Sequence, residues 1–304
     1  MDGKRMVAAT TGAGHITLVE EDIPPLRPGT LLVEVHNSLV SPGTELGGWR
    51  ELRRQLDDPQ PYPKPRPFGY SNAGIVLEVS EGVEEFAPGD RVACIGNGFA
   101  QHTNYAVVPH NLCVLLPDGV TFAQGAYAML AATGLHAVRR GQPELGEYVL
   151  VIGLGLVGQL TAQLYQLAGT YVMGWDKIPF CTEIAQRWGI DATAVVGVED
   201  EIAATKAFTR GQGLDAAVFA FGGDGNQALE STRACLKCAP DGHPYGRIVV
   251  VGLSHFNWVP GSPMTNIDIR QASRTGPGYH DDHWETGPGY PPVFMRWTTR
   301  TNLE

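Results

Sequence analysis

The 304-residue sequence lacks the features that place a protein in a membrane or outside the cell. It has no apolar run of the roughly 18 residues that a transmembrane helix needs, so we expect no membrane partner. Residues 6–9 are apolar but too few for the core of a signal peptide. Repeats and low-complexity tracts are also missing, and an apolar fraction of 43% is typical of a globular protein.

Positive charge is scarce, because 22 Lys and Arg residues stand against 32 Asp and Glu residues and leave a net charge of −10. Basic side chains form no cluster larger than a pair, such as Arg53-Arg54 or Arg139-Arg140. A nucleic-acid surface needs a basic patch that neutralises several phosphates. We therefore expect no nucleic-acid partner.

Cysteine is also scarce, and five residues in a chain of this length form no disulfide framework. An odd number of free thiols fits the reducing cytoplasm, where we expect the protein to be located. Cys235 and Cys238 are spaced like half of a zinc site, but no second such pair completes a tetrahedral set. We expect both to be packing residues.

The pattern of residue types along the chain changes near residue 131. Before it, short β-like runs separated by Gly- and Pro-rich segments predict an all-β unit with strands at 31–35, 74–79, 91–95 and 105–108. After it, apolar strands alternating with helical patterns predict a parallel sheet covered on both faces. The strands expected there are 149–152, 171–175, 194–196, 216–221 and 248–251, with 266–272 at the sheet edge. The helices expected between them are 159–167, 180–188, 199–208 and 226–236.

A glycine motif lies between the first of these strands and the first helix. Gly153 permits a tight turn, Gly155 lets the backbone approach a pyrophosphate, and Gly158 lets the helix pack closely on the strand. The pyrophosphate would meet free N–H groups at the helix N-terminus, around Leu156 and Val157. The second half of the chain is therefore interpreted as a dinucleotide-binding domain.

Asp176 ends the next strand, at the position where a carboxylate accepts hydrogen bonds from the adenosine ribose. Its charge would repel a 2′-phosphate, which predicts NAD rather than NADP as the cofactor. The adjacent Lys177 weakens this discrimination slightly. Further cofactor contacts are expected just after later strands, at Phe221, Gly252 and Leu253.

Four segments resemble the medium-chain dehydrogenase/reductase superfamily, in matching order and spacing over about residues 20–275. They are residues 69–76, similar to its Gly-His-Glu-x-x-Gly-x-Val signature, the turn 86–92, the strand 105–109 and the glycine motif 153–158. Residues 40–45 also resemble the subgroup of 2-desacetyl-2-hydroxyethyl bacteriochlorophyllide dehydrogenase and related short oxidoreductases.

The resemblance implies a GroES-like all-β domain plus an α/β Rossmann domain with a doubly wound parallel sheet. We expect a GroES-like catalytic domain at residues 1–130 and a Rossmann NAD-binding domain at 131–274. Residues 275–304 would form a return segment and loop towards the catalytic domain, short at the C-terminus compared with the family.

The sequence departs from the family where its zinc enzymes carry their ligands. Pro42, Tyr70 and Met129 occupy the three ligand positions. Proline cannot bind a metal, and a phenol and a thioether are poor ligands for Zn²⁺. No lobe of four cysteines lies between Arg91 and Tyr105 either. The comparison implies a member without zinc.

Other groups must then polarise a carbonyl or accept a hydroxyl proton. Thr44 matches the hydroxyl that relays protons in the zinc enzymes, and the Tyr70 phenol could donate to a developing alkoxide. His102 is a candidate acid–base group, although a satisfied surface histidine is the open alternative. Glu45 is expected to be structural and to pair with an arginine.

Two Gly-Pro-Gly-Tyr copies bracket an acidic, His-containing stretch in residues 275–290, which predicts an ordered loop or a lid. The resemblance implies that the chain returns here towards the nicotinamide, so His280, Asp281 and His283 are candidates for proton transfer. Their spacing fits no common metal site. A solvated loop or a subunit contact remains open.

The leading hypothesis is a zinc-independent, NAD(H)-dependent oxidoreductase that interconverts an alcohol and a carbonyl on a small polar substrate such as a sugar. One alternative is a zinc-free NAD(P)H-dependent reductase of activated C=C bonds in quinones or enones. Another is a non-catalytic NAD-binding module. We also expect a homodimer, because an exposed edge strand at 266–272 invites pairing with its symmetry mate.

Overall fold

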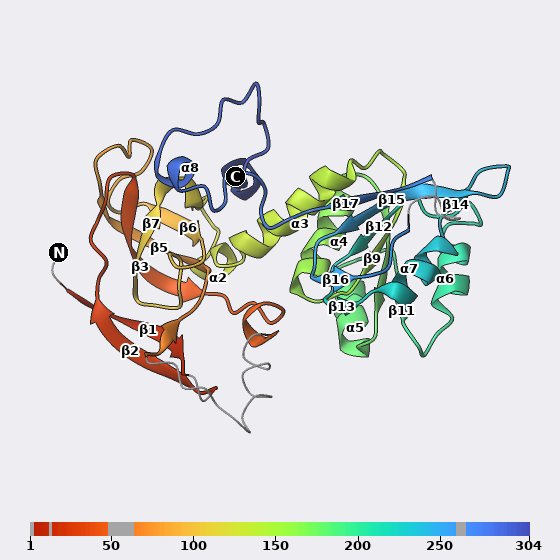
Figure 1. The fold of residues 1–304 in the computed structure, drawn as a ribbon, viewed down its shortest axis with the longest axis horizontal. Coiled ribbons are helices and arrows are strands. Elements are labelled where there is room, and N and C mark those ends of the chain that lie inside the picture. The colour runs from red at the N-terminus through yellow and green to blue at the C-terminus, as the bar shows by residue number, and fades with distance from the viewer. Residues whose placement is uncertain (1–2, 12–13, 48–63, 260–265) are drawn as a thin grey trace. The chain divides into compact units, whose positions relative to one another are not determined.

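The computed structural model describes residues 3–11, 14–47, 64–259 and 266–304, so Arg53 and Arg54 lie outside the described residues. The chain divides into two compact units, whose elements are drawn in Figure 1. Unit 1 consists of Met1–Ala132 with Gly276–Glu304, and unit 2 consists of Thr133–Thr275. No helix in the described part of the chain is long and apolar enough to cross a membrane.

Unit 1 is built on a five-stranded antiparallel sheet with strand order β7-β3-β5-β6-β8. Leu31, Val33 and Val76 contribute to its apolar core. Gly74 has no room for a side chain, because a Cβ would lie 1.9 Å from the Glu34 carbonyl oxygen. All four strands expected in this half are present. The sheet comprises β3 (Thr30–Ser38), β5 (Ser71–Val79), β6 (Arg91–Ile95), β7 (Tyr105–Pro109) and β8 (Cys113–Leu115).

A second, three-stranded sheet in unit 1 joins β1 (Lys4–Thr10) to β2 (Ile16–Asp22) and to β4 (Arg66–Pro67). The sequence patterns do not predict the hairpin. The reason lies in β2, which ends in three acidic residues and buries no side chain fully. The short helices η1 (His110–Leu112) and α2 (Phe122–Gly125) follow the main sheet, and α3 (Ala128–Gly141) leads into unit 2.

Residues 276–304 return to unit 1 and add no strand to its sheets. They contain two short helices, α8 (Asp282–Thr286) and α9 (Thr299–Leu303). Trp284 is 2% exposed and packs in the same apolar cluster as the sheet. Its ring requires glycine at position 278, since a Cβ there would lie 2.5 Å from the indole. Residues 275–290, expected to form an ordered loop or a lid, thus contain one short helix and no strand.

Unit 2 contains a mostly parallel sheet with order β11-β10-β9-β12-β15, and β17 pairs with the other side of β15. This is the doubly wound order of a dinucleotide-binding fold, so the expected α/β Rossmann class is confirmed. The strands are β9 (Tyr148–Ile152), β10 (Tyr171–Asp176), β11 (Ala192–Val195), β12 (Ala216–Phe219), β15 (Pro244–Val250) and β17 (Asn266–Gln271).

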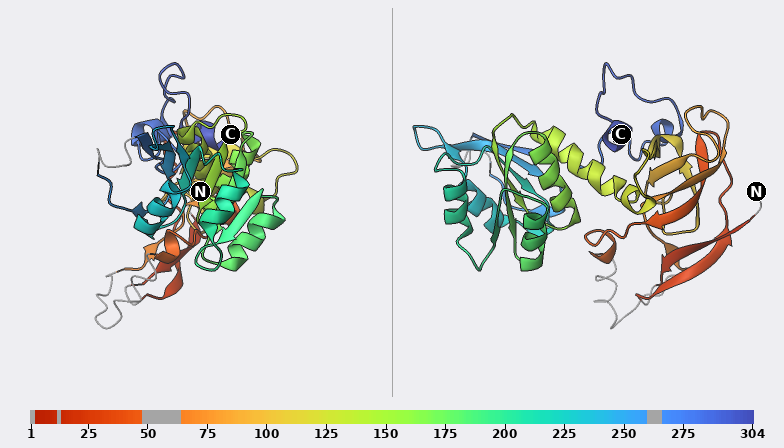
Figure 2. Two further views of the ribbon diagram at one scale, coloured as in Figure 1. Left: turned by 90° about the vertical axis from the view of Figure 1, so that its right-hand side faces the viewer. Right: turned by 180° about the vertical axis from the view of Figure 1, so that it is seen from behind.

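Both faces of this sheet are buried. Along β9, Leu150 and Ile152 enter one apolar cluster, whereas Val149 and Val151 enter another, as expected when helices cover both sides. Figure 2 shows these helices flanking the sheet in green and teal. They are α4 (Leu156–Leu167), α5 (Pro179–Arg187), α6 (Glu201–Phe208) and α7 (Asn226–Arg233).

Three short strands complete unit 2. β14 (Lys237–Cys238) pairs antiparallel with the start of β15, and β13 (Gly223–Asp224) pairs with β16 (Ser254–His255). Because α7 ends before β14, the two cysteines lie outside the helix. Cys235 is buried as expected, but Cys238 is exposed and is not a packing residue.

Candidate functional site

The glycine motif forms a tight turn at the carboxyl end of β9, in the middle of the unit 2 sheet. Gly153 has a φ of 89°, which a side chain would strain, and its N–H donates to the Trp175 carbonyl oxygen at 2.8 Å. A Cβ on Gly153 would also lie 2.9 Å from the Ala220 carbonyl oxygen, just after β12. The turn thus lies between β9 and β12, where the strand order reverses and such sheets bind ligands.

The start of α4 leaves space for an anion. A Cβ on Gly155 would meet no atom within 4 Å, whereas one on Gly158 would lie 1.8 Å from the Gly153 carbonyl oxygen. Gly158 is therefore required for packing, and Gly155 keeps an open approach. No side chain caps this helix, so the first N–H groups, around Leu156 and Val157, face outward from its positive end.

Asp176 ends β10 and connects the glycine turn after β9 to the chain that follows β10. Its Oδ2 accepts the Leu154 N–H at 2.6 Å, and its Oδ1 accepts the Ile178 N–H at 2.8 Å. Each carboxylate oxygen retains a further lone pair for a ribose hydroxyl. Lys177 follows and is exposed.

The remaining expected contacts lie at the same edge. Phe221 follows β12, and Gly252 and Leu253 follow β15. Gly252 packs against the backbone after β12, because a Cβ there would lie 2.2 Å from the Phe221 carbonyl oxygen. Leu253 is 84% exposed. All ten residues expected to bind a cofactor therefore lie at the carboxyl edge of one parallel sheet.

A separate polar cluster lies in unit 1 around Tyr70. The phenol forms side-chain hydrogen bonds with Ser41 and Thr44. Burial raises the pKa of Tyr70 above its ordinary value, the two hydrogen bonds lower it, and the negative charge of Glu45 raises it. The structure therefore brings together two of the expected catalytic residues, Tyr70 and Thr44. It adds Ser41, which sequence reasoning missed because serine in a Pro-Gly turn carries no distinctive signal.

His102 belongs to the same region of unit 1. Its Nε2 lies 3.0 Å from Glu45 Oε1, and its Nδ1 lies 2.9 Å from Ser38 Oγ. Both ring nitrogens are thus occupied, and the side chains of His102 and Glu45 are only 9% and 7% exposed. Within the described residues, Glu45 pairs with His102 and with no arginine. The expected arginine partner is therefore not found there.

The other three expected catalytic residues occupy the short helix α8 and its start. Asp281 caps the helix, because its carboxylate accepts the N–H groups of His283 and Trp284. It also accepts a hydrogen bond from Tyr290, which is the main reason why its pKa lies below the ordinary value. His280 and His283 are exposed. This geometry gives Asp281 a structural task.

The resemblance places Pro42, Tyr70 and Met129 at the zinc-ligand positions of the family. Pro42 is exposed, while Met129 lies in the apolar cluster against which Tyr70 packs. Among the residues that the structure describes, no three His, Cys, Asp or Glu side chains gather as a metal site.

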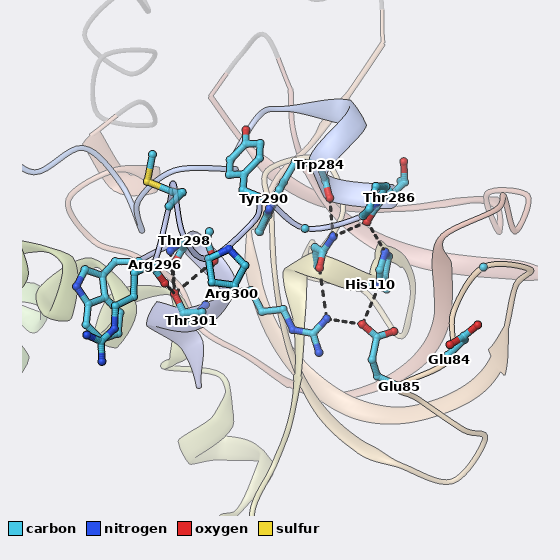
Figure 3. Close-up of a pocket in the computed structure, with 18 residues that line it drawn as sticks. Glu84, Glu85, His110, Trp284, Thr286, Tyr290, Arg296, Thr298, Arg300 and Thr301 are labelled. Carbon is cyan, nitrogen blue, oxygen red and sulfur yellow. Dashed lines mark hydrogen bonds and ion pairs between the residues drawn. The ribbon is translucent and has the colours of Figure 1, made fainter.

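A cavity of about 960 Å³ opens beside the return segment in unit 1 (Figure 3). Arg300 on α9 donates to Glu85 Oε1 at 2.6 Å and to Asn111 Oδ1 at 3.3 Å. Asn111 and His110 in turn contact the Gly287 carbonyl oxygen at 2.9 and 3.2 Å. These groups satisfy one another and fasten the segment to the sheet. No sequence motif indicates this network, because Glu85 and Arg300 lie 215 positions apart.

The sequence is similar to those of known dehydrogenases. Residues 27–133 match the alcohol dehydrogenase GroES-like domain. Sorbitol dehydrogenase of Mus musculus is 28% identical over 302 residues, which cover 89% of this chain and 79% of that enzyme. Sorbitol dehydrogenase of Rattus norvegicus is 30% identical over 226 residues, which cover 65% of this chain and 62% of that enzyme. The match thus spans less than two thirds of the rat relative.

Several solved structures share the fold. An oxidoreductase/dehydrogenase of unknown specificity from Escherichia coli has a TM-score of 0.77 at 19% identity, covering 99% of this chain and 89% of that chain. An alcohol dehydrogenase from Thermus sp. ATN1 has a TM-score of 0.73 at 20% identity, covering 89% and 85%. The CurK enoyl reductase has a TM-score of 0.70 at 17% identity, covering 88% and 80%. An alcohol dehydrogenase and an enoyl reductase thus share this fold, so the fold alone does not distinguish alcohol oxidation from enoyl reduction.

Proposed function

We propose that this chain, an alcohol dehydrogenase-type oxidoreductase of the medium-chain dehydrogenase/reductase superfamily, uses NAD(H) to interconvert an alcohol and a carbonyl without zinc. Its substrate would be a small polar molecule such as a polyol, the class to which sorbitol, named in the mouse and rat relatives, belongs. The observation that carries the proposal is the hydroxyl cluster of Tyr70, Ser41 and Thr44 at a position where zinc enzymes of the family have a metal ligand.

The unit 2 edge would hold the cofactor. The turn at Gly153 and Gly155 and the N-terminus of α4 would receive the pyrophosphate, and Asp176 would bind the adenosine ribose. The charge of Asp176 favours NAD over NADP. When bound, the nicotinamide would accept or donate the hydride.

Tyr70 and Thr44 would handle the substrate oxygen. Because burial raises the pKa of Tyr70, its phenol stays protonated at neutral pH and can donate a hydrogen bond. In the reducing direction Tyr70 would hold the carbonyl oxygen and give it a proton as negative charge develops there. In the oxidising direction the phenolate form of Tyr70 would accept the hydroxyl proton and return to the phenol.

Zinc independence rests on donor chemistry. Pro42 offers no donor atom, and the thioether of Met129 is 6% exposed within an apolar cluster. Hard or borderline cations bind such sites poorly. A phenol that donates protons would take over the polarising task.

The cytoplasm and a homodimer belong to this proposal. All five cysteines are free, including Cys94 and Cys113, whose Sγ atoms lie only 3.6 Å apart, which fits a reducing compartment. β17 pairs with β15 along one side and ends the described sheet, so its other side is available to a second copy.

The test is NADH formation from NAD⁺, and then NADPH formation from NADP⁺, across polyols, sugars and simple alcohols, starting with sorbitol. We expect turnover with NAD⁺, and a loss of about 100-fold or more in Tyr70→Phe. Turnover only in the reduction of quinones or enones would favour the C=C reductase, whose fold neighbour is the enoyl reductase. Cofactor binding with no turnover on either panel would leave a non-catalytic NAD-binding module.

A further inference from the structure

The turn that carries Ser41 and Thr44 is closed by Glu45. The Glu45 N–H donates to the Ser41 carbonyl oxygen at 2.9 Å, and Glu45 Oε2 accepts the Ser41 N–H at 2.5 Å. These reciprocal bonds fix the backbone on both sides of Thr44. The side chain of Glu45 is 7% exposed, so the clasp is shielded from water.

His102 holds the other oxygen of the same carboxylate. Its Nε2 faces Glu45 Oε1, and its Nδ1 faces Ser38 Oγ at the end of β3. Phe68 packs edge-on against the imidazole, with ring centroids 5.0 Å apart. The ring is therefore fixed on three sides and has no nitrogen free for a substrate.

These contacts link His102 to the Tyr70 phenol in sequence. His102 orients Glu45, Glu45 closes the turn, and the turn presents the hydroxyls of Ser41 and Thr44 to the phenol. Among the described residues, the Tyr70 phenol has its hydrogen bonds with Ser41 and Thr44 of this turn, and the Tyr70 carbonyl oxygen accepts the Gly96 N–H. Ser41 and Thr44 thus contact the phenol directly, whereas Glu45 and His102 support its orientation through the turn.

We propose that Glu45 and His102 are positioning residues, which fix the Tyr70 phenol for proton transfer by holding the 41–45 turn. The inference deepens the proposed function and rests on it for the role of Tyr70. It replaces the interpretation of His102 as an acid–base group with that of a support for the group that does the chemistry.

The test compares two substitutions of one residue. Glu45→Gln removes the charge but keeps an oxygen for the Ser41 N–H, so the turn remains closed. Glu45→Ala removes both the charge and the oxygen that accepts the Ser41 N–H. Thermal melting checks that each variant is folded. The titration of Tyr70 is then followed by tyrosinate absorbance. The absorbance of the Tyr70→Phe protein is subtracted to isolate the signal of Tyr70.

Glu45→Gln should lower the pKa of Tyr70, because the negative charge that raises it is gone. Glu45→Ala should give a higher pKa than Glu45→Gln, because the Ser41 and Thr44 hydrogen bonds that lower it are lost. Equal pKa values in the two variants would overturn the proposal. Glu34→Gln is the matched control: it breaks an exposed Glu–His pair in the same sheet, with Nε2 of His36 3.6 Å from Glu34 Oε2, and should leave Tyr70 unchanged.

A kinetic arm uses sorbitol and NAD⁺, or whichever panel substrate turns over. His102→Gln and Glu45→Ala should each lower kcat by about tenfold or more, with little change in KM, as for lost general acid–base positioning. A rise in KM alone would contradict the positioning role. If the panel is silent, the proposed function fails, while the Tyr70 titration still decides whether the turn is held as described.

Discussion

The carboxylate of Asp176 accepts the backbone N–H of Leu154 at 2.6 Å, so the acid at the end of β10 also holds the glycine turn after β9. One side chain therefore couples the shape of the pyrophosphate turn to the group that would read the ribose. Changes at Asp176 should affect both cofactor affinity and cofactor choice.

Asp176→Ser should weaken NAD⁺ binding by about tenfold or more, since it removes a charged hydrogen-bond acceptor worth about 1.5–3 kcal/mol. It should also narrow the difference between NAD⁺ and NADP⁺, because the 2′-phosphate no longer meets a like charge. Titration of tryptophan fluorescence with each dinucleotide measures both. Asp241→Asn, at an exposed turn, is the control, and an unchanged affinity ratio in Asp176→Ser would refute this role.

The two glycines Gly155 and Gly158 should separate binding from folding. Gly155→Ala meets open space, so we expect the free energy of unfolding to stay within about 0.5 kcal/mol while cofactor affinity falls. Gly158→Ala places a methyl group 1.8 Å from the Gly153 carbonyl oxygen, which should cost about 1–3 kcal/mol. Thermal melts with and without NAD⁺ distinguish them. Unimpaired binding by Gly155→Ala would contradict the site.

Arg300→Met should loosen the return segment and lower the free energy of unfolding by about 1 kcal/mol. Burial would raise the pKa of Glu85, but the hydrogen bond from Arg300, a hydrogen bond from the Glu85 backbone itself and the charge of His110 together bring the pKa below its ordinary value. A carboxylate whose pKa is lower in the folded state than in the unfolded state stabilises the fold at pH values above its unfolded-state pKa. This stabilisation is lost as the pH falls through its folded-state pKa. The variant should therefore lose less stability than the wild type on acidification. Urea unfolding at neutral and acidic pH measures this, and parallel losses would argue against it.

Tyr165→Phe should stabilise unit 2. The ring is fully buried, and its hydroxyl has no hydrogen-bond partner among the described residues. A buried, unpaired hydroxyl is costly, so its removal should raise the free energy of unfolding by about 1 kcal/mol. Urea denaturation is the measurement, with Tyr171→Phe at a half-exposed position as the control. A destabilised Tyr165→Phe would mean that the hydroxyl makes a bond to water.

Local signals made much of unit 2 predictable from sequence. The signals are glycines at a turn, apolar strands and an acidic residue at a strand end, and each can be recognised from neighbouring residues in the sequence. They indicate Gly153, Gly158 and Asp176 directly. Strand and helix ends were less accurate. The pattern extended α7 to Leu236, but the helix ends at Arg233, because Leu236 forms a parallel β-bridge with Leu214.

Pairings between distant residues could not be predicted. His102 and Glu45 meet across 57 positions, and neither occurs in a motif that announces the other. The same holds for the contact of Arg300 with Glu85. In α8, the sequence Asp281-Asp-His283 suggested chemistry, but an aspartate at a helix start commonly caps it, as Asp281 does.

The most direct test of a zinc-free, NAD-dependent dehydrogenase is turnover after metal removal. The protein is dialysed against EDTA, its zinc content is measured by mass spectrometry, and NADH formation is followed with NAD⁺ and the active polyol. We expect less than stoichiometric zinc and full activity. One tightly held zinc per chain, with activity lost on its removal and restored by its return, would contradict the proposal.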